Sequence, residues 1–258
     1  MIAFSAGEVT QPPRKLIPVE PHGGYFGPMP AISKDAMGIK LVNFYPGIGI
    51  HTHQATIMLF KPETGETLAI MEGGLITEMR AAAVSAGATR PFAAPDAKVL
   101  AILGAGVQAR SHVEAMRCVR DFDEVRVWAR NPEKEKAFAD EHGAVAMDAE
   151  DAVRGADVVV TATSSQVGEW LKEGAHINAV GAPIASWREL DDEVMSRCTV
   201  IAYSQNACMK ESGDVILLAA EIHAEIGEVL ADKVSVDAEE TTCSKASASP
   251  SRTSSPRR

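Results

Sequence analysis

The sequence predicts an α/β protein with two parts, a doubly wound parallel sheet and a smaller sheet-rich domain. Lys98–Leu103 is a short apolar run of strand-forming residues, the stretch GAGVQA follows it at once, and a helical pattern then leads to a second apolar run at Val125–Trp128. Strands and helices alternate from there on, whereas residues 1–91 contain short β-rich runs and turn residues. These observations indicate a strand, turn, helix, strand unit at the centre of the chain.

The first 91 residues are expected to form the sheet-rich domain. Its five β-rich runs are separated by Pro, Gly and Asp, and Pro62-Glu-Thr-Gly65 is a hairpin turn pattern. A helix of small residues is expected over Leu75–Ala88, and Arg90-Pro91 marks the domain boundary. The five runs are Lys15–Val19, Gly24–Met29, Ile39–Phe44, Ala55–Phe60 and Thr67–Met71.

The glycine-containing turn predicts a dinucleotide site. Gly104 allows a tight turn, and Gly106 allows a pyrophosphate to approach the backbone. Ala109 is small enough for the helix to pack on the sheet, and the helix N-terminus faces the phosphates. Because the motif stands between a strand and a helix, it indicates a Rossmann domain. The expected cofactor contacts in this turn are Gly104, Ala105, Gly106, Val107 and Gln108.

The end of the second strand bears on the choice of dinucleotide. An NAD-selective site usually has an acid there to hold the ribose 2′-hydroxyl, but this chain has Trp128-Ala129-Arg130-Asn131. Arg130 can pair with a 2′-phosphate, so NADPH is favoured and NADH remains an alternative. If Arg130 is instead a solvated surface charge, both cofactors bind.

The Rossmann domain is expected over residues 92–215. Parallel strands bring their carboxyl ends to the cofactor, so Thr163 and Val180 are expected to line the nicotinamide side. Asn131 is expected to cap the helix after the second strand. The further elements are helices at Pro132–Glu141, Asp148–Arg154, Glu189–Met195 and Ala219–Leu230, and strands at Ala144–Met147, Val158–Thr163, His176–Val180 and Val200–Tyr203. Residues 216–242 are expected to return to the first domain.

Composition limits the partners. The 258 residues include 35 acids against 25 Lys and Arg, for a net charge of −10. Nucleic acid is therefore not an expected partner. No apolar run approaches the roughly 20 residues needed to cross a bilayer, and the scattered cysteines suit reduced thiols, so a cytoplasmic protein is expected. His51-x-His53 lacks a third ligand, and no metal site is expected.

Five separated segments of the chain resemble one known family. In order they read ITEMRAAAVSA, GAGVQA, GEWLKEGAHINAVGA, RELDDEVM and KESGDV. They are similar to the ornithine cyclodeaminase/mu-crystallin family, and the last three are closest to its mu-crystallin branch of ketimine reductases. The resemblance covers about residues 8–242. It implies a homodimer with an NAD(P)-binding Rossmann domain, and a sheet-rich domain that pairs subunits and holds a small imino or amino acid.

By match of motif, Arg14, Lys40 and Arg80 resemble the family's catalytic and substrate-facing cations. Arginine can hold a substrate carboxylate with two hydrogen bonds. A partly desolvated Lys40 can deliver a proton to an imine nitrogen. Thr52 and His53 resemble residues that flank the cofactor, and Glu211 resembles a ligand contact. The alternative for each charge is a solvated surface residue.

The chain departs from the family at Pro183, where cyclodeaminases have Asp and the mu-crystallin branch has Ser. Proline offers neither an acid nor a hydroxyl, so reduction of an amino-acid-derived ketimine with NAD(P)H is favoured. The alternatives are ornithine cyclodeaminase or an alanine-dehydrogenase-like activity, and a non-catalytic NADPH- or ligand-binding protein or inactive truncated family member.

Both ends of the sequence differ from the family pattern. Helices that precede the AFSAGEV segment in relatives are missing, so the first domain is expected to be incomplete at both ends. From Cys243 the chain reads CSKASASPSRTSSPRR, without acids or periodicity, and residues 243–258 are expected to form an aberrant, disordered tail. A reading one nucleotide out of frame gives VFKSLGIAVEDVVAA, the family ending, so we hypothesise a frameshift. Such a truncated chain is expected to risk losing activity.

Overall fold

The computed structural model describes residues 1–12, 15–45, 53–163, 170–181, 185–237 and 239–245. These residues form two compact units. Ala3–Thr77 make up one, called the antiparallel unit, while Met1–Ile2 and the described chain from Glu78 onward make up the other, called the parallel unit. The division therefore falls at residues 77 and 78, before the expected boundary at Arg90-Pro91. A short helix, α1 (Ile2–Ser5), begins the chain.

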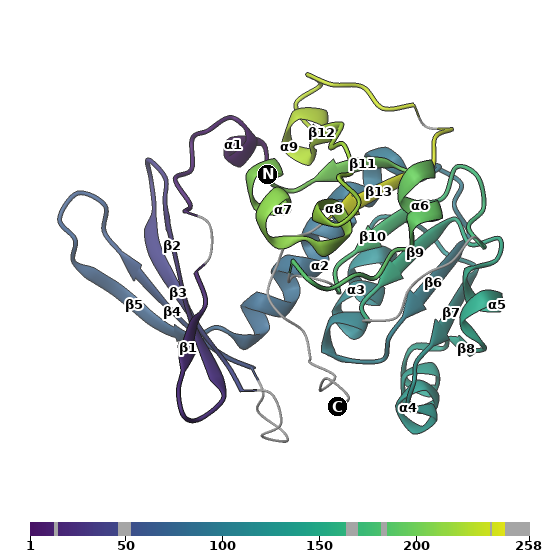
Figure 1. The fold of residues 1–258 in the computed structure, drawn as a ribbon, viewed down its shortest axis with the longest axis horizontal. Coiled ribbons are helices and arrows are strands. Elements are labelled where there is room, and N and C mark those ends of the chain that lie inside the picture. The colour runs from purple at the N-terminus through teal and green to yellow at the C-terminus, as the bar shows by residue number, and fades with distance from the viewer. Residues whose placement is uncertain (13–14, 46–52, 164–169, 182–184, 238, 246–258) are drawn as a thin grey trace. The chain divides into compact units, whose positions relative to one another are not determined.

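The antiparallel unit is a five-stranded meander in which each strand pairs with the next along the chain. This confirms the five predicted strands, and Figure 1 shows them in purple and blue. The turn before the last strand closes with Gly65 N–H donating to Lys61 O at 2.8 Å. The strands are β1 (Ile17–Val19), β2 (Gly24–Ile32), β3 (Met37–Phe44), β4 (His53–Phe60) and β5 (Thr67–Glu72).

Helix α2 (Gly74–Phe92) is longer than expected because it continues through Arg90-Pro91. Proline lacks an N–H group and so loses one helical hydrogen bond. Ala88 and Phe92 are buried to 1% and 2% exposure and anchor the last turn, which outweighs that loss. Most of the small residues predicted to allow close packing are buried, namely Ala81, Ala82, Ser85, Ala86 and Ala88, whereas Ala83 is exposed.

The parallel unit is built on an eight-stranded sheet in which every paired neighbour is parallel. The strand order is β12-β11-β13-β10-β9-β6-β7-β8. The strands are β6 (Val99–Leu103), β7 (Glu124–Trp128), β8 (Val145–Ala146), β9 (Val158–Thr161), β10 (His176–Ala179), β11 (Thr199–Ala202), β12 (Ala224–Glu225) and β13 (Thr242–Lys245). The helices are α3 (Val107–Arg117), α4 (Pro132–His142), α5 (Ala149–Val153), α6 (Asp192–Arg197), α7 (Gln205–Glu211), α8 (Gly213–Ile216) and α9 (Ile226–Val229).

Both faces of this sheet carry a hydrophobic core. Side chains alternate along a strand, so Leu100 and Ile102 enter one core cluster while Ala101 and Leu103 of the same strand enter the other. Strands that are buried on both faces read as continuous apolar runs, which explains why the sequence pattern located them.

Strand β13 corrects the expectation of a disordered tail for residues 243–245, and the rest of that predicted tail, residues 246–258, lies outside the described residues. The strand lies between β10 and β11 in the middle of the sheet, where Figure 1 shows it in yellow. Its polar side chains all have partners: Thr242 Oγ1 lies 2.8 Å from His176 Nδ1, and Ser244 Oγ donates to Asn178 Oδ1 at 2.9 Å. A buried strand whose polar side chains all have hydrogen-bond partners need not be an apolar run, so the hydrophobic pattern did not predict β13.

Residues 216–242 also differ from expectation, because their described part belongs to the parallel unit and does not return to the first domain. The helix predicted over Ala219–Leu230 is absent as such. Ala219 has φ +48°, which interrupts any helix, and the segment instead forms strand β12 and the single turn α9.

Candidate functional site

The glycine turn lies between β6 and α3, as predicted. Gly104 has φ +124°, a conformation open to glycine, and an added Cβ would lie 2.7 Å from the carbonyl oxygen of Ala162. Its N–H donates to Trp128 O at 2.7 Å, which ties the turn to the carboxyl end of β7. Both the backbone angle and the close approach therefore require glycine here.

Gly106 forms the N-cap of α3, and no side chain caps this helix. A Cβ at Gly106 would meet only open space, so the backbone can be approached from outside. The first N–H groups of a helix attract anions, and a pyrophosphate fits this position. Val107 is 53% exposed beside it. Gln108 Oε1 is buried and accepts no hydrogen bond from any residue described by the structure. These features fit a bound dinucleotide.

Helix α3 is fixed to α2 through a buried histidine. His112 Nδ1 donates to Gln108 O at 2.6 Å, because a carbonyl oxygen can only accept, and its Nε2 then accepts from the Ser85 hydroxyl at 3.0 Å. Burial lowers the pKa of His112 to about 4. The imidazole is therefore neutral near pH 7 and holds the dinucleotide helix in place.

Arg130 and Asn131 follow the end of β7, whose last residue, Trp128, accepts the hydrogen bond from Gly104 in the glycine turn. Asn131 caps α4 by accepting a hydrogen bond from Lys134 N at 3.0 Å, which confirms the predicted cap. Arg130 is exposed. Sequence reasoning missed Glu135, whose Oε2 accepts from Ala129 N–H at 2.5 Å. Glu135 lies one helical turn beyond the cap, and the local sequence pattern did not indicate that its carboxylate would bind the backbone after β7.

Thr163 and Val180 lie at the carboxyl ends of β9 and β10, on the same edge as the glycine turn. Ala162 N–H donates to Leu103 O at 2.8 Å, and Val180 N–H donates to Thr161 O at 3.1 Å. The ends of β6, β9 and β10 are therefore adjacent, as expected for residues lining the nicotinamide side.

The remaining site residues are only partly placed. Arg80 is half-buried on α2 and Glu211 is half-buried at the end of α7, both in the parallel unit. Lys40 is half-buried on β3 of the antiparallel unit, where it pairs with Met29 and Ile57. Arg14, Thr52 and Pro183 lie outside the described residues. For His53 the structure describes the backbone at the start of β4.

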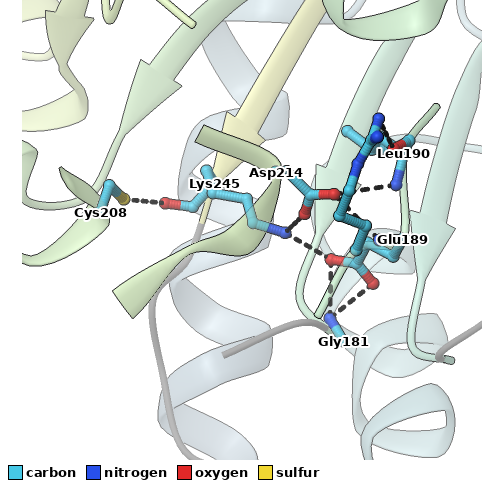
Figure 2. A network of polar contacts seen from close by, with 7 residues as sticks. Gly181, Glu189, Leu190, Cys208, Asp214 and Lys245 are labelled. Carbon is cyan, nitrogen blue, oxygen red and sulfur yellow. Dashed lines mark hydrogen bonds and ion pairs between the residues drawn. The ribbon is translucent and has the colours of Figure 1, made fainter. Parts of the chain in front are cut away.

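Three buried charges near β10 were not predicted. Lys245 Nζ lies 2.7 Å from Glu189 Oε1 and 2.5 Å from Asp214 Oδ2 (Figure 2). Burial alone would lower the pKa of Lys245, but the two carboxylates raise it above its ordinary value. Burial raises the pKa of Glu189, and Asp214 adds to that effect while Lys245 opposes it. The sequence signal was slight: Glu189 and Asp214 are charges directly beside apolar residues.

Comparison with known proteins agrees with this geometry. The model of the ornithine cyclodeaminase/mu-crystallin family matches residues 1–247. A ketimine reductase mu-crystallin from Macropus fuliginosus is 46% identical over 254 residues, covering 93% of this chain and 81% of the relative.

Two solved structures are similar over 94% of this chain. One is the Thermococcus litoralis Δ1-pyrroline-2-carboxylate reductase in complex with NADH and L-proline, with a TM-score of 0.86, 34% identity and 83% of its chain covered. The other is an archaeal alanine dehydrogenase dimer with bound NAD, with a TM-score of 0.86, 31% identity and 81% covered. The fold, the dinucleotide turn and these likenesses together establish that the chain belongs to the ornithine cyclodeaminase/mu-crystallin family.

Proposed function

We propose that this chain is an NAD(P)H-dependent reductase that converts an amino-acid-derived ketimine into the corresponding amino acid. The observation that carries the proposal is the open glycine turn at Gly104 and Gly106, next to the strand ends that bear Thr163 and Val180. The 46% identity to a ketimine reductase supports the reaction type, and the similarity to a reductase holding NADH and L-proline supports a carboxylate-bearing imine.

The dinucleotide supplies a hydride for the imine carbon. The chain's own part is to hold the substrate and to provide a proton. We propose that Arg14, Lys40 and Arg80 fix the substrate carboxylate, and that Lys40 delivers the proton to the imine nitrogen. Glu211 contacts the substrate, and Thr52 and His53 flank the cofactor. Support for these roles comes from motif resemblance.

NADPH is the proposed preferred cofactor, because residues 129–131 carry Arg130 and no acid. Glu135 weighs against a strong preference, since its carboxylate reaches the N–H of Ala129 at 2.5 Å and places a negative charge near the expected 2′-phosphate. We therefore expect NADH to be accepted as well.

We propose that the protein acts as a homodimer. The similar alanine dehydrogenase was solved as a dimer. In the antiparallel unit, Leu68 and Ile70 of β5 are 60% and 65% exposed and lie on the same face of the strand. Adjacent exposed apolar side chains are typical of a protein interface.

Four free thiols support the proposed cytoplasmic location, because disulfides are rare there. Among the described residues, no helix is long and apolar enough to cross a membrane.

The test is oxidation of NADPH, followed at 340 nm, with Δ1-piperideine-2-carboxylate as the ketimine. We expect turnover that depends on both the imine and the enzyme. Pyruvate with ammonia tests the alanine-dehydrogenase-like alternative, which the similar alanine dehydrogenase structure favours, and ornithine with NAD⁺ tests cyclodeamination. Turnover of ornithine with ammonia release and none of the imine would contradict the proposal.

A further inference from the structure

Glu189, Asp214 and Lys245 form a buried ionic cluster, called here the Glu189 network. Glu189 and Asp214 are 0% exposed and Lys245 is 2% exposed. Removing three charges from water is costly and is offset only by close contacts. The proposed reaction uses none of these charges, so the network requires another explanation.

Through Glu189, the network binds the backbone N–H group of Gly181. Both oxygens of Glu189 accept from Gly181 N, at 2.8 and 2.7 Å (Figure 2). Asp214 Oδ1 in turn accepts from the backbone N–H groups of Glu189 and Leu190, at 2.9 and 3.1 Å. Lys245 of β13 joins the two carboxylates. The network therefore holds the peptide that follows β10.

Holding this N–H group also fixes a carbonyl group. A trans peptide is planar, with its N–H and C=O pointing in opposite directions. Because the N–H of Gly181 points at Glu189, the carbonyl oxygen of Val180 points away from Glu189. Gly181 also packs closely against Thr163, just beyond the end of β9, since an added Cβ would overlap the backbone oxygen of Thr163 and a carboxylate oxygen of Glu189.

We propose that the Glu189 network positions the Val180–Gly181 peptide so that the Val180 carbonyl oxygen accepts a hydrogen bond from the carboxamide NH₂ of the nicotinamide. This inference rests on the proposed function, in which Val180 lines the nicotinamide. A charge-assisted hydrogen bond from Gly181 is stronger than a neutral one, and an acceptor held in advance needs no reorganisation when the cofactor binds. Glu189, Asp214 and Lys245 are positioning residues, because they act through Gly181.

Binding of NADP⁺ and of its 3-acetylpyridine analogue tests the proposal without any turnover. The analogue has a methyl group in place of the carboxamide NH₂ and cannot donate the hydrogen bond. In fluorescence titrations the wild type is expected to bind NADP⁺ about 2- to 10-fold more tightly than the analogue, the range for one hydrogen bond.

Glu189→Gln should bring that ratio close to one. Glutamine replaces one of the two acceptor oxygens with an NH₂ donor and carries no charge, so it can no longer accept from Gly181 N through both ends or form a charge-assisted bond, and the peptide loses its fixed orientation. Asp214→Asn should also lower the ratio of the two affinities. Asp214 Oδ1 accepts from the backbone N–H of Glu189 and Oδ2 accepts from Lys245, whereas asparagine has one acceptor oxygen in place of two. This second variant keeps the test intact if Glu189→Gln does not fold.

Asp157→Asn is the matched control. The Asp157 carboxylate accepts from Lys98 N and Val99 N at 2.7 and 2.9 Å and pairs with Lys172, but it precedes β9 and lies at the opposite end of the strands. It should leave the ratio unchanged.

Equal binding of NADP⁺ and the analogue by the wild type would overturn the inference. The inference would also be overturned if Glu189→Gln and Asp214→Asn weakened the binding of NADP⁺ and of the analogue equally. The proposed function would still stand in that case. A wild type that binds neither NADP⁺ nor NAD⁺ would overturn both.

Discussion

Lys245→Met is expected to destabilise the parallel unit strongly and in a pH-dependent way. The Lys245 ammonium contacts one oxygen each of Glu189 and Asp214 at 2.7 and 2.5 Å, and all three groups are enclosed. Methionine keeps an unbranched apolar stem like that of lysine but leaves two carboxylates facing each other without a countercharge. Loss of one partner from a buried ion pair typically costs about 3–5 kcal/mol.

The cost should be largest at alkaline pH. Burial raises the pKa of Glu189 even in the wild type, with a further contribution from Asp214, and Lys245 opposes both. Without Lys245 the pKa of Glu189 rises further, whereas in the unfolded chain it returns to the ordinary 4.5. The folded variant therefore binds more protons than the unfolded chain as pH rises above 4.5, so its stability falls with rising pH. We expect a deficit of about 3–5 kcal/mol at pH 8 and a smaller one at pH 5.

Urea unfolding followed by tryptophan fluorescence measures this deficit. Trp128, Trp170 and Trp187 all belong to the parallel unit, so the signal reports on the part that contains the network. Lys136→Met is the control, because the Lys136–Asp140 pair is exposed at 76% and 67% and should have no measurable effect. A Lys245→Met protein as stable as the wild type at both pH values would refute the reasoning.

Four further predictions concern the parallel unit and its dinucleotide site. Gly104→Ala should lower the unfolding midpoint and weaken NADPH binding, because its Cβ would lie 2.7 Å from Ala162 O at φ +124°. Gly106→Ala should weaken NADPH binding without lowering the unfolding midpoint, since the added Cβ meets open space in the protein but stands where the pyrophosphate is expected to approach. Unchanged NADPH affinity would count against a pyrophosphate site at this turn. The wild type should lose stability as pH falls from 6.5 towards 4, by up to about 1.4 kcal/mol per pH unit from His112, because the folded state keeps that imidazole neutral. Urea titrations of His112→Asn should show a shallower pH dependence, and an equally steep one would exclude this origin. Arg130→Ala should reduce NADPH affinity about tenfold and leave NADH affinity unchanged, as titrations with both can check; an equal loss for both would argue against a 2′-phosphate contact.

Local chemistry made the dinucleotide turn predictable. Position 104 needs a positive φ and a close approach to Ala162, and only glycine meets both demands, so the glycine in the sequence indicates the turn. Strands β6, β9 and β11 of the parallel sheet were also predictable, because burial on both faces requires continuous apolar runs such as Val158–Thr161. The cap at Asn131 was predictable because it forms within one turn.

Long-range polar contacts were not predictable. Lys245 is stabilised by carboxylates that lie 56 and 31 residues earlier in the chain, so Thr242–Lys245 has no local strand pattern although it fills the middle of the sheet. The same holds for Asn178, whose side chain bonds to Thr89 and Ser244. Buried polar groups need partners, but which partners they find depends on the fold and not on spacing.

The measurement that tests the central claim most directly is transfer of deuterium from the cofactor. The protein is incubated with NADPH carrying two deuterium atoms at C4 of the nicotinamide and with Δ1-piperideine-2-carboxylate, and the product is analysed by mass spectrometry. A ketimine reductase places one deuterium on the former imine carbon, so the amino acid product should be one mass unit heavier than with ordinary NADPH. Formation of an unlabelled product, or of no amino acid while NADPH binds, would contradict the account.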